Sequence, residues 1–323
     1  MIIVTGAAGF IGKNLVDYLN RKGYKNLVLV DSLRKKNYFK NLLDLKYCDF
    51  INFENGMDYL KKSIESIEIE AIFHIGANAD VLINDCNLMM DMNFEHSKFW
   101  FNVAKERQIP FIYASSSAVY GNSNCFKVSI KCEKPHNEYA FSKLVFDNYI
   151  RCNLNNLKNK VIGFRFFNVF GLGEFHKGKN ASLPYRFFSF ILDKEKGYID
   201  LFDKKIERDY VWVRDVCEVL YNSWQLDIKN GIYNLGSGNP ISHDKLANII
   251  VEVLASEGLI NKDEKDRYIK KIPMPQHLID KFQFFTKAED LLPWIKDITK
   301  NNEEKIKTYI KQLSERYKND NKN

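Results

Sequence analysis

The chain has 323 residues, a formal net charge of +7 and 45% hydrophobic residues. This length allows a sizeable core in one large domain or two smaller ones, and the composition is that of an ordinary globular protein. No apolar run reaches the roughly 18 residues that a membrane-spanning helix needs. The first strand begins at the N-terminus, so we expect no signal peptide and a cytoplasmic protein.

The basic charge does not predict a nucleic-acid partner. Lys and Arg are scattered, and much of the excess lies in solvated helices and in the Lys/Asn-rich tail. The charge instead favours phosphorylated substrates. The six cysteines form no Cys-x-x-Cys pair, which predicts free thiols in a reducing compartment. The six histidines share no ligand spacing, so we expect no metal.

The first half of the chain alternates strands and helices, which is typical of a parallel sheet with helices on both faces. The predicted strands are 1–5, 26–31, 49–53, 70–76, 110–115 and 160–167, and the predicted helices are 11–22, 57–67, 86–107 and 137–157. Beyond residue 171 we expect a helix at 182–195, a strand at 210–213, a helix from 214 and a strand at 231–235. We therefore predict a doubly wound α/β domain (1–171 and about 205–236) and a smaller α/β lobe for the substrate (about 172–204 and 237–323).

Glycines at positions 6, 9 and 12 follow the first strand and open the first helix, which begins with Phe10 and Ile11. Such a turn lets the backbone approach a pyrophosphate, and the helix N-terminus attracts the phosphates. Asp31 closes the second strand, where a carboxylate can hold the adenosine ribose. These features predict a Rossmann-type dinucleotide site; the alternative is an ordinary glycine-rich turn.

The cofactor is ambiguous from the sequence. Asp31 favours the bare ribose of NAD, whereas Arg34, Lys35 and Lys36 follow Ser32 closely and could hold a 2′-phosphate. We predict NADP by a narrow margin over NAD, the alternative being that residues 34–36 form a solvated loop.

A serine run, Ser115–Ser117, ends the fifth strand, and Tyr139 and Lys143 share one face of a later helix. A neighbouring ammonium and an oxidised nicotinamide both favour the phenolate of Tyr139, which could then take a hydroxyl proton. Ser116 could hydrogen-bond the same oxygen. The alternative is that Tyr139 and Lys143 are chance surface neighbours.

Together these motifs resemble the extended short-chain dehydrogenase/reductase family, which acts mostly on nucleotide-linked sugars. The resemblance implies a cofactor contact for Asn93 and substrate contacts for Ser117, Asn168 and Ser182. It also implies that Arg208 meets the nucleotide diphosphate, for which its planar fork is well suited.

The segment Gly163–Gly171, then Glu174, His176–Gly178 and Ala181–Ser182, is most similar to the ADP-heptose 6-epimerases within that family. In these enzymes a second base occupies the position of Lys177, beside His176. The resemblance implies oxidation at C6 of the heptose and return of hydride to the other face, with Tyr139 and Lys177 serving opposite faces. Lys177 could instead be a solvated or phosphate-binding lysine.

The sequence departs from those epimerases at Ile75–Asp80 and at Leu172–Gly173, so another sugar remains open. A 4-epimerase needs no Lys177. A dehydratase is disfavoured because Ser117 and Ala118 replace an Asp–Glu pair, and a regulatory protein is disfavoured because Tyr139 and Lys143 are both present. The family resemblance implies a homo-oligomer and no nucleic-acid or membrane partner.

Overall fold

The computed structural model describes residues 1–34, 37–80, 83, 85–276 and 283–321; Lys35, Lys36 and one of the six histidines, His277, lie outside them. The chain divides into two compact units. Unit 1 comprises Met1–Phe166 and Arg214–Leu235, and unit 2 comprises Phe167–Val213 and Gly236–Asn323. The unit boundaries therefore lie at 166/167 and 213/214, rather than near 171 and 205.

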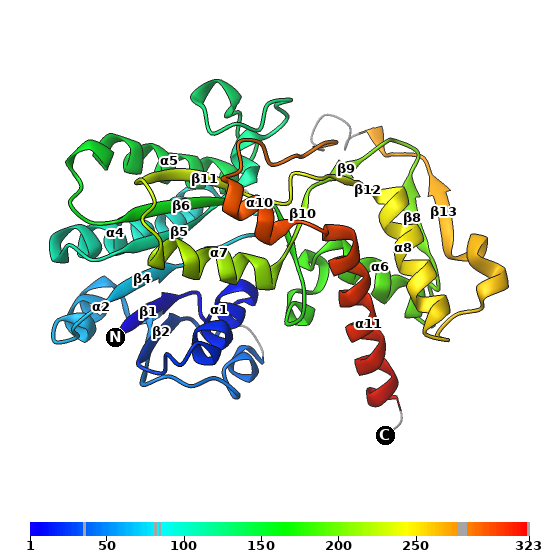
Figure 1. Cartoon of the computed structure of the whole chain (residues 1–323), viewed down its shortest axis with the longest axis horizontal. Coiled ribbons are helices and arrows are strands. Elements are labelled where there is room, and N and C mark those ends of the chain that lie inside the picture. The colour runs from blue at the N-terminus through cyan, green and yellow to red at the C-terminus, as the bar shows by residue number, and fades with distance from the viewer. Residues whose placement is uncertain (35–36, 81–82, 84, 277–282, 322–323) are drawn as a thin grey trace. The chain divides into compact units, whose positions relative to one another are not determined.

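Unit 1 contains a seven-stranded parallel sheet in the order β11-β6-β5-β4-β1-β2-β3 (Figure 1). Its strands are β1 (Ile2–Thr5), β2 (Leu27–Asp31), β3 (Asp49–Asn52), β4 (Ala71–His74), β5 (Phe111–Ser116), β6 (Val161–Phe166) and β11 (Gly231–Leu235). Strands β1, β2, β4, β5 and β6 are buried throughout, as expected of strands covered on both faces. The predicted parallel α/β sheet is confirmed.

Helices cover both faces of this sheet. Figure 1 shows α1 (Phe10–Arg21) and α7 (Val213–Gln225) on one face, and α4 (His96–Arg107) and α5 (Glu138–Asn153) on the other. Helix α2 (Met57–Ile64) contributes Leu60 and Ile64 to the core that α4 and α5 form with the sheet. The doubly wound arrangement places the carboxyl ends of β1, β2, β4 and β5 at one edge, where ligands of such folds bind.

The predicted helix 86–107 is interrupted. Helix α3 (Cys86–Met89) is followed by a π-helical segment, Met90–Glu95, and then by α4. The wide turn holds Asn93 fully buried. The apolar periodicity of a sequence is an average over several helical turns, so it does not reveal a single wide turn. The sequence pattern therefore indicated one continuous helix.

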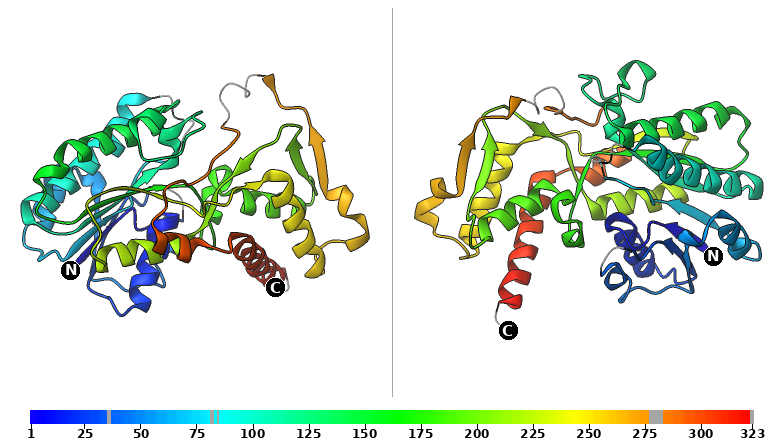
Figure 2. Two further views of the ribbon diagram at one scale, coloured as in Figure 1. Left: turned by 45° about the horizontal axis from the view of Figure 1, so that its top comes forward. Right: turned by 180° about the vertical axis from the view of Figure 1, so that it is seen from behind.

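The described part of unit 2 contains helices and three two-stranded sheets (Figure 2). The strand pairs are β7 (Asn168–Phe170) with β10 (Tyr210–Trp212), β9 (Glu207–Arg208) with β12 (Ile241–Ser242), and β8 (Ile199–Phe202) with β13 (Ile269–Ile272). Its α-helices among the described residues are α6 (Leu183–Leu192), α8 (His243–Ser256), α10 (Pro293–Thr299) and α11 (Asn302–Asp320). Their apolar faces meet in a core that includes Phe187, Ile250 and Tyr309.

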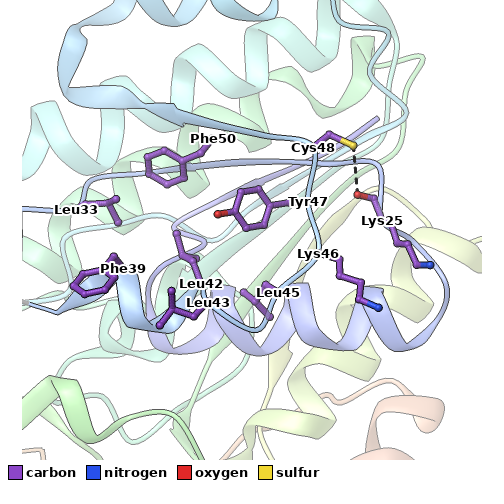
Figure 3. Close-up of a pocket in the computed structure, with 10 residues that line it drawn as sticks. All are labelled: Lys25, Leu33, Phe39, Leu42, Leu43, Leu45, Lys46, Tyr47, Cys48 and Phe50. Carbon is purple, nitrogen blue, oxygen red and sulfur yellow. Dashed lines mark hydrogen bonds between the residues drawn. The ribbon is translucent and has the colours of Figure 1, made fainter.

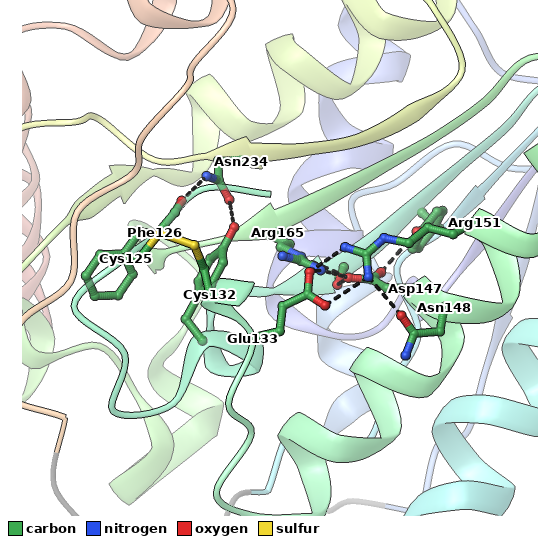
Figure 4. Close-up of polar contacts among 12 residues, drawn as sticks. Cys125, Phe126, Cys132, Glu133, Asp147, Asn148, Arg151, Arg165 and Asn234 are labelled. Atoms are coloured by element: carbon green, nitrogen blue, oxygen red, sulfur yellow. Dashed lines mark hydrogen bonds and ion pairs between the residues drawn. A yellow bond between two sulfur atoms is a disulfide. The ribbon is translucent and has the colours of Figure 1, made fainter. Parts of the chain in front are cut away.

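One cysteine prediction is wrong. Cys125 and Cys132 form a disulfide, with their Cα atoms 5.2 Å apart, whereas Cys48, Cys86, Cys152 and Cys217 are free thiols. The disulfide closes the loop that follows Gly121 and returns the chain to Glu133 (Figure 4). Spacing alone could not reveal that the loop folds back on itself.

Within the described ranges, no helix is long and apolar enough to cross a membrane. The same residues contain no group of three or more His, Cys, Asp or Glu side chains that could hold a metal ion.

Candidate active site

The glycine turn joins β1 to α1 at the edge of the sheet. Gly6 has a φ of +66°, which favours glycine, and its N–H donates to the carbonyl of Val30 at 2.8 Å. A Cβ at Gly12 would lie 2.0 Å from the carbonyl oxygen of Gly6. Gly9 is the N-cap of α1 and brings no side chain to it, so the N–H groups of the first turn face this edge. The turn thus has the close packing and the exposed helix N-terminus that suit a pyrophosphate.

Asp31 ends β2, and its side chain also binds the glycine turn. Its carboxylate, which is buried, accepts the backbone N–H of Ala8 at 2.7 Å and that of Ser32 at 2.6 Å. The Asn41 side-chain amide donates to the Ala8 carbonyl at 2.8 Å from the other side. The carboxylate that we expected at the adenosine ribose therefore also fixes the glycine turn.

Glu54 was missed by the sequence reasoning. It lies in the short turn Phe53–Asn55 that follows β3, and one carboxylate oxygen accepts both the Ser32 hydroxyl at 2.5 Å and the Arg34 Nε at 2.7 Å. The basic side chain that was expected to meet a 2′-phosphate is thus paired with a carboxylate beside Asp31. An acidic residue just after the third strand was the available signal.

Ser116, Tyr139 and Lys143 are brought together in unit 1. Ser116 ends β5, and Tyr139 and Lys143 stand one turn apart on α5, whose start is capped by the Asn137 side chain. Burial raises the pKa of Tyr139, and a hydrogen bond with Ser116 lowers it in part. Burial lowers the pKa of Lys143 to about 8, against the opposing effect of Asp147. Ser117 follows, half-buried, in the turn Ser117–Tyr120.

Asn93 supports this arrangement from the π-helical segment. Its side chain accepts the N–H of Asn78 at 2.7 Å and donates to the carbonyl of Asn78 and to the Ser142 hydroxyl, both at 3.0 Å. The Ser142 hydroxyl donates in turn to the Tyr139 carbonyl at 2.8 Å. Asn93 therefore connects the loop after β4 to the turn of α5 that carries Tyr139.

Asp147, Arg165 and Glu133 form a buried ionic network (Figure 4). Asp147 accepts the hydroxyls of Tyr113 at 3.0 Å and Ser115 at 2.9 Å, and the Arg165 Nε at 2.9 Å. Arg165 also donates to Glu133 at 2.7 Å. Asp147 stands four residues after Lys143, so the stripe 139, 143, 147 was a signal that the sequence reasoning did not use.

Unit 2 carries the other predicted site residues. Asn168 lies in β7 and its side-chain amide donates to the Asp209 carbonyl at 2.9 Å. Arg208 lies half-buried in β9, and burial lowers its pKa to about 10. Burial and the nearby Arg208 together lower the pKa of His243 to about 3. His243 is therefore neutral near pH 7, and the charged Arg208 guanidinium beside it can bind phosphate oxygens.

The loop with the proposed second base is short. His176 and Lys177 lie half-buried in the 3-10 helical segment Phe175–Asn180, which bends at Gly178, with a φ of +54°. Ser182 follows as the N-cap of α6. Its hydroxyl donates to Glu174 at 2.6 Å and accepts the backbone N–H of Tyr185 at 3.4 Å, so it joins the base of this loop to the first turn of α6.

A separate cavity of about 750 Å³ lies in unit 1 along the segment between β2 and β3 (Figure 3). Leu33, Phe39 and Phe50 gather at one end, and Lys25 and Lys46 lie at the other. None of the predicted site residues lines it.

Comparison with known proteins agrees with this geometry. The family model described as "NAD dependent epimerase/dehydratase family" matches residues 2–236. The Helicobacter pylori ADP-L-glycero-D-manno-heptose-6-epimerase is similar, with 28% identity, a TM-score of 0.80, and coverage of 97% of this chain and 95% of that one.

Two further structures share the fold at lower identity. A UDP-N-acetylglucosamine 4-epimerase from Methanobrevibacter ruminantium M1, in complex with UDP-N-acetylmuramic acid, has 23% identity, a TM-score of 0.79 and coverage of 98% of both chains. The UDP-glucose 4-epimerase of Thermotoga maritima has 21% identity, a TM-score of 0.78, and coverage of 98% of this chain and 99% of that one. With its glycine turn, its serine-tyrosine-lysine group and a family match over most of its length, this chain belongs to the NAD-dependent epimerase/dehydratase family of enzymes.

Proposed function

We propose that this protein inverts one carbon of a nucleotide-diphosphate sugar by transient oxidation, and that its substrate is an ADP-glycero-manno-heptose epimerised at C6. The observation that carries the proposal is the group Ser116, Tyr139 and Lys143 in a chain that also places Lys177 in a bent loop of unit 2. The similarity to the Helicobacter pylori heptose epimerase supports the choice of sugar.

A nicotinamide dinucleotide supplies the chemistry of hydride removal and return when it is bound. In one orientation of the sugar, Tyr139 takes the proton of the sugar hydroxyl as the carbon is oxidised to a ketone. Ser116 donates a hydrogen bond to the same oxygen. The Lys143 ammonium stabilises the phenolate of Tyr139 and would hold the ribose of the dinucleotide. When the ketone is reduced on its opposite face, Lys177 donates the proton to the oxygen.

The dinucleotide would be held by the glycine turn at Gly6, Gly9 and Gly12, by Asp31 and by Lys143. Of the two cofactors, we propose NAD in place of the NADP that the sequence narrowly favoured. Asp31 offers a carboxylate to a bare ribose, and Glu54 adds a second negative charge while it pairs with Arg34. Both carboxylates would repel a 2′-phosphate.

Arg208 and Asn168 would bind the nucleotide diphosphate and the sugar. The lowered pKa of Arg208, to about 10, still leaves its guanidinium charged at neutral pH. Its fork can donate two parallel hydrogen bonds to phosphate oxygens. The homo-oligomer and the cytoplasmic location belong to the same proposal.

The decisive variant is Lys177→Met. ADP-D-glycero-D-manno-heptose is incubated with the enzyme in deuterated water and followed by proton NMR. We expect epimerisation to slow about 100-fold to 1,000-fold, as for loss of a general acid/base, while the purified protein still binds the dinucleotide. The matched control is Lys179→Met, an exposed lysine of the same loop, which should stay within twofold of wild type.

The outcomes separate the alternatives. Direct hydride return predicts that no deuterium enters C6. Near-normal turnover by Lys177→Met would reject the two-base mechanism. Turnover of a UDP-hexose at C4, with none of the heptose, would assign a 4-epimerase and attribute the difference to Ile75–Asp80 and Leu172–Gly173.

A further inference from the structure

Glu174 is a buried carboxylate that the mechanism above does not use. It lies directly before the Lys177 loop, and only 1% of its surface is exposed. Four neutral groups donate to its two oxygens: the backbone N–H of Gly171 at 3.2 Å, the backbone N–H of Ser182 at 2.5 Å, the Ser182 hydroxyl at 2.6 Å and the Tyr309 hydroxyl at 2.9 Å.

These contacts close the loop at its base. Gly171 precedes the loop and Ser182 follows it, so one side chain joins the incoming and outgoing backbone across the segment that carries Lys177. At the two ends of the loop, the Lys177 N–H donates to the Glu174 carbonyl at 2.9 Å, and the Ala181 N–H donates to that of Gly178 at 3.0 Å. The segment is a short 3-10 stretch that bends at Gly178, and the Glu174 carboxylate adds hydrogen bonds to the residues on either side of it.

The fourth contact connects the loop to the C-terminal helix α11. The Tyr309 ring is fully buried and packs on Phe170, with ring centroids 5.7 Å apart. Burial and the negative charge of Glu174 raise the pKa of the Tyr309 phenol, so it stays protonated and remains a donor. The position of the carboxylate is therefore fixed from α11 as well as from the loop.

We propose that Glu174 is a positioning residue that holds Lys177 in place for proton exchange with the substrate. The inference rests on the proposed role of Lys177. Replacing Glu174 by alanine leaves four donors without their acceptor, and buried donors without acceptors are strongly disfavoured. The loop would rearrange to satisfy them, and Lys177 would lose its geometry while Ser116, Tyr139 and Lys143 of unit 1 keep theirs.

The first test compares Glu174→Ala and Glu174→Gln. We expect kcat for epimerisation to fall about 100-fold in the alanine variant, with KM and dinucleotide affinity within about threefold of wild type. Glutamine keeps one acceptor oxygen, so Glu174→Gln should be less impaired. The decrease in log kcat that it causes should be at most two thirds of the decrease caused by Glu174→Ala. Tyr309→Phe removes a single donor and should lose less than tenfold. If the alanine variant does not fold, these two milder variants carry the test.

A double-mutant cycle shows whether Glu174 acts through Lys177. In the Lys177→Met background, adding Glu174→Ala should change kcat by less than twofold, because the group being positioned is already absent. A second readout is the rate of acetylation of Lys177 relative to Lys179 in the same loop, measured by mass spectrometry. This ratio should change at least threefold in Glu174→Ala.

Three results are distinguishable. Wild-type kcat in Glu174→Ala would overturn the positioning role. The role would also be overturned if adding Glu174→Ala to Lys177→Met lowered kcat as much as Glu174→Ala lowers it in the wild-type background. Wild-type kcat in Lys177→Met alone would instead reject the two-base function, whatever Glu174 does. An unchanged acetylation ratio together with a low kcat would show that Glu174 acts on some group other than Lys177.

Discussion

The two units hold their site residues in different ways. In unit 1 the predicted site residues lie at the ends of strands of one parallel sheet and on the helices that cover it, and a buried carboxylate, Asp147, is paired there with the guanidinium of Arg165. In unit 2 they lie on two-stranded pairs and a short loop, and the buried carboxylate there, Glu174, is bound by two backbone N–H groups and two hydroxyls.

The difference separates two uses of a buried carboxylate. Asp147 is paired with the positive charge of Arg165, and removing Asp147 would leave that buried charge without this partner. Because an unpaired charge in the interior is strongly destabilising, we expect Asp147 to act mainly on the stability of the fold. Glu174 collects neutral donors from either end of a loop, and its first effect is on local geometry. Three variants of unit 1 test this distinction.

The largest effect is expected for Asp147→Ala. It leaves the Arg165 guanidinium with Glu133 as its remaining described carboxylate and removes the acceptor of Tyr113 and Ser115. Breaking a buried pair in this way costs about 3–5 kcal/mol. Urea unfolding followed by circular dichroism measures it.

The control is Asp17→Ala, which breaks an exposed ion pair with Arg21 and should cost less than about 1 kcal/mol. If Asp147→Ala and Asp17→Ala lowered the free energy of unfolding equally, Asp147 would have no special effect on stability and would not differ from Glu174 in this way. If Glu174→Ala lowered the free energy of unfolding more than Asp147→Ala, the distinction between Asp147 and Glu174 would be reversed.

The next effect concerns Lys143 and pH. Its folded pKa of about 8 lies below the ordinary value of 10.5, so the folded state disfavours the charged form. Burial of the charged lysine lowers the free energy of unfolding by its full amount below pH 8, and this destabilisation decreases as pH rises toward 10.5. The unfolding free energy of the cofactor-free wild type, relative to Lys143→Met, should therefore rise by about 2.5 kcal/mol from pH 7 to pH 10.

Asp147 raises the pKa of Lys143, and Lys143 in turn contributes to the lowered pKa of the buried His74. Both remain in Lys143→Met, so the difference between the two proteins isolates the lysine. Parallel pH curves for wild type and variant would mean that Lys143 keeps an ordinary pKa, and that Asp147 fully offsets its burial.

The smallest effect is expected at the adenosine end of unit 1. Glu54→Gln removes one negative charge beside Asp31 and weakens the pairing of Arg34. The affinity for NADPH should rise about threefold to tenfold, as expected for an exposed pair, while that for NADH stays within twofold. Fluorescence titration of both nucleotides measures this ratio.

The exposed Glu106→Gln variant controls for net charge. A wild-type protein that already prefers NADPH would contradict the proposed choice of NAD. It would support the NADP predicted from the sequence.

The strands and helices of unit 1 could be predicted from the sequence because each one is indicated by a short, continuous stretch of residues. The strand near 26–31 is β2, and the strand 231–235 is β11, since buried parallel strands are continuous apolar runs bounded by turns. The spacing of Tyr139 and Lys143 likewise follows from helical periodicity alone. The break at 90–95 was missed because a π turn depends on what Asn93 contacts, and not on its neighbours in sequence.

Unit 2 could be predicted only in part. Strands β9 and β12 are two residues long, and their pairing joins segments that are far apart in the chain. Buried polar contacts, such as Glu174 with Tyr309, have no periodicity to reveal them. The same holds for Glu54 with Arg34 and for the disulfide between Cys125 and Cys132, which depend on how loops fold back.

The contact between Glu174 and Tyr309 connects the segment that carries Lys177 to a part of the chain that the family model does not cover. The family model ends at residue 236, whereas Tyr309 lies in α11, well beyond it. A substitution at Tyr309, far along the sequence from Lys177, therefore alters the hydrogen bonds at the base of that segment and leaves the residues of unit 1 unchanged.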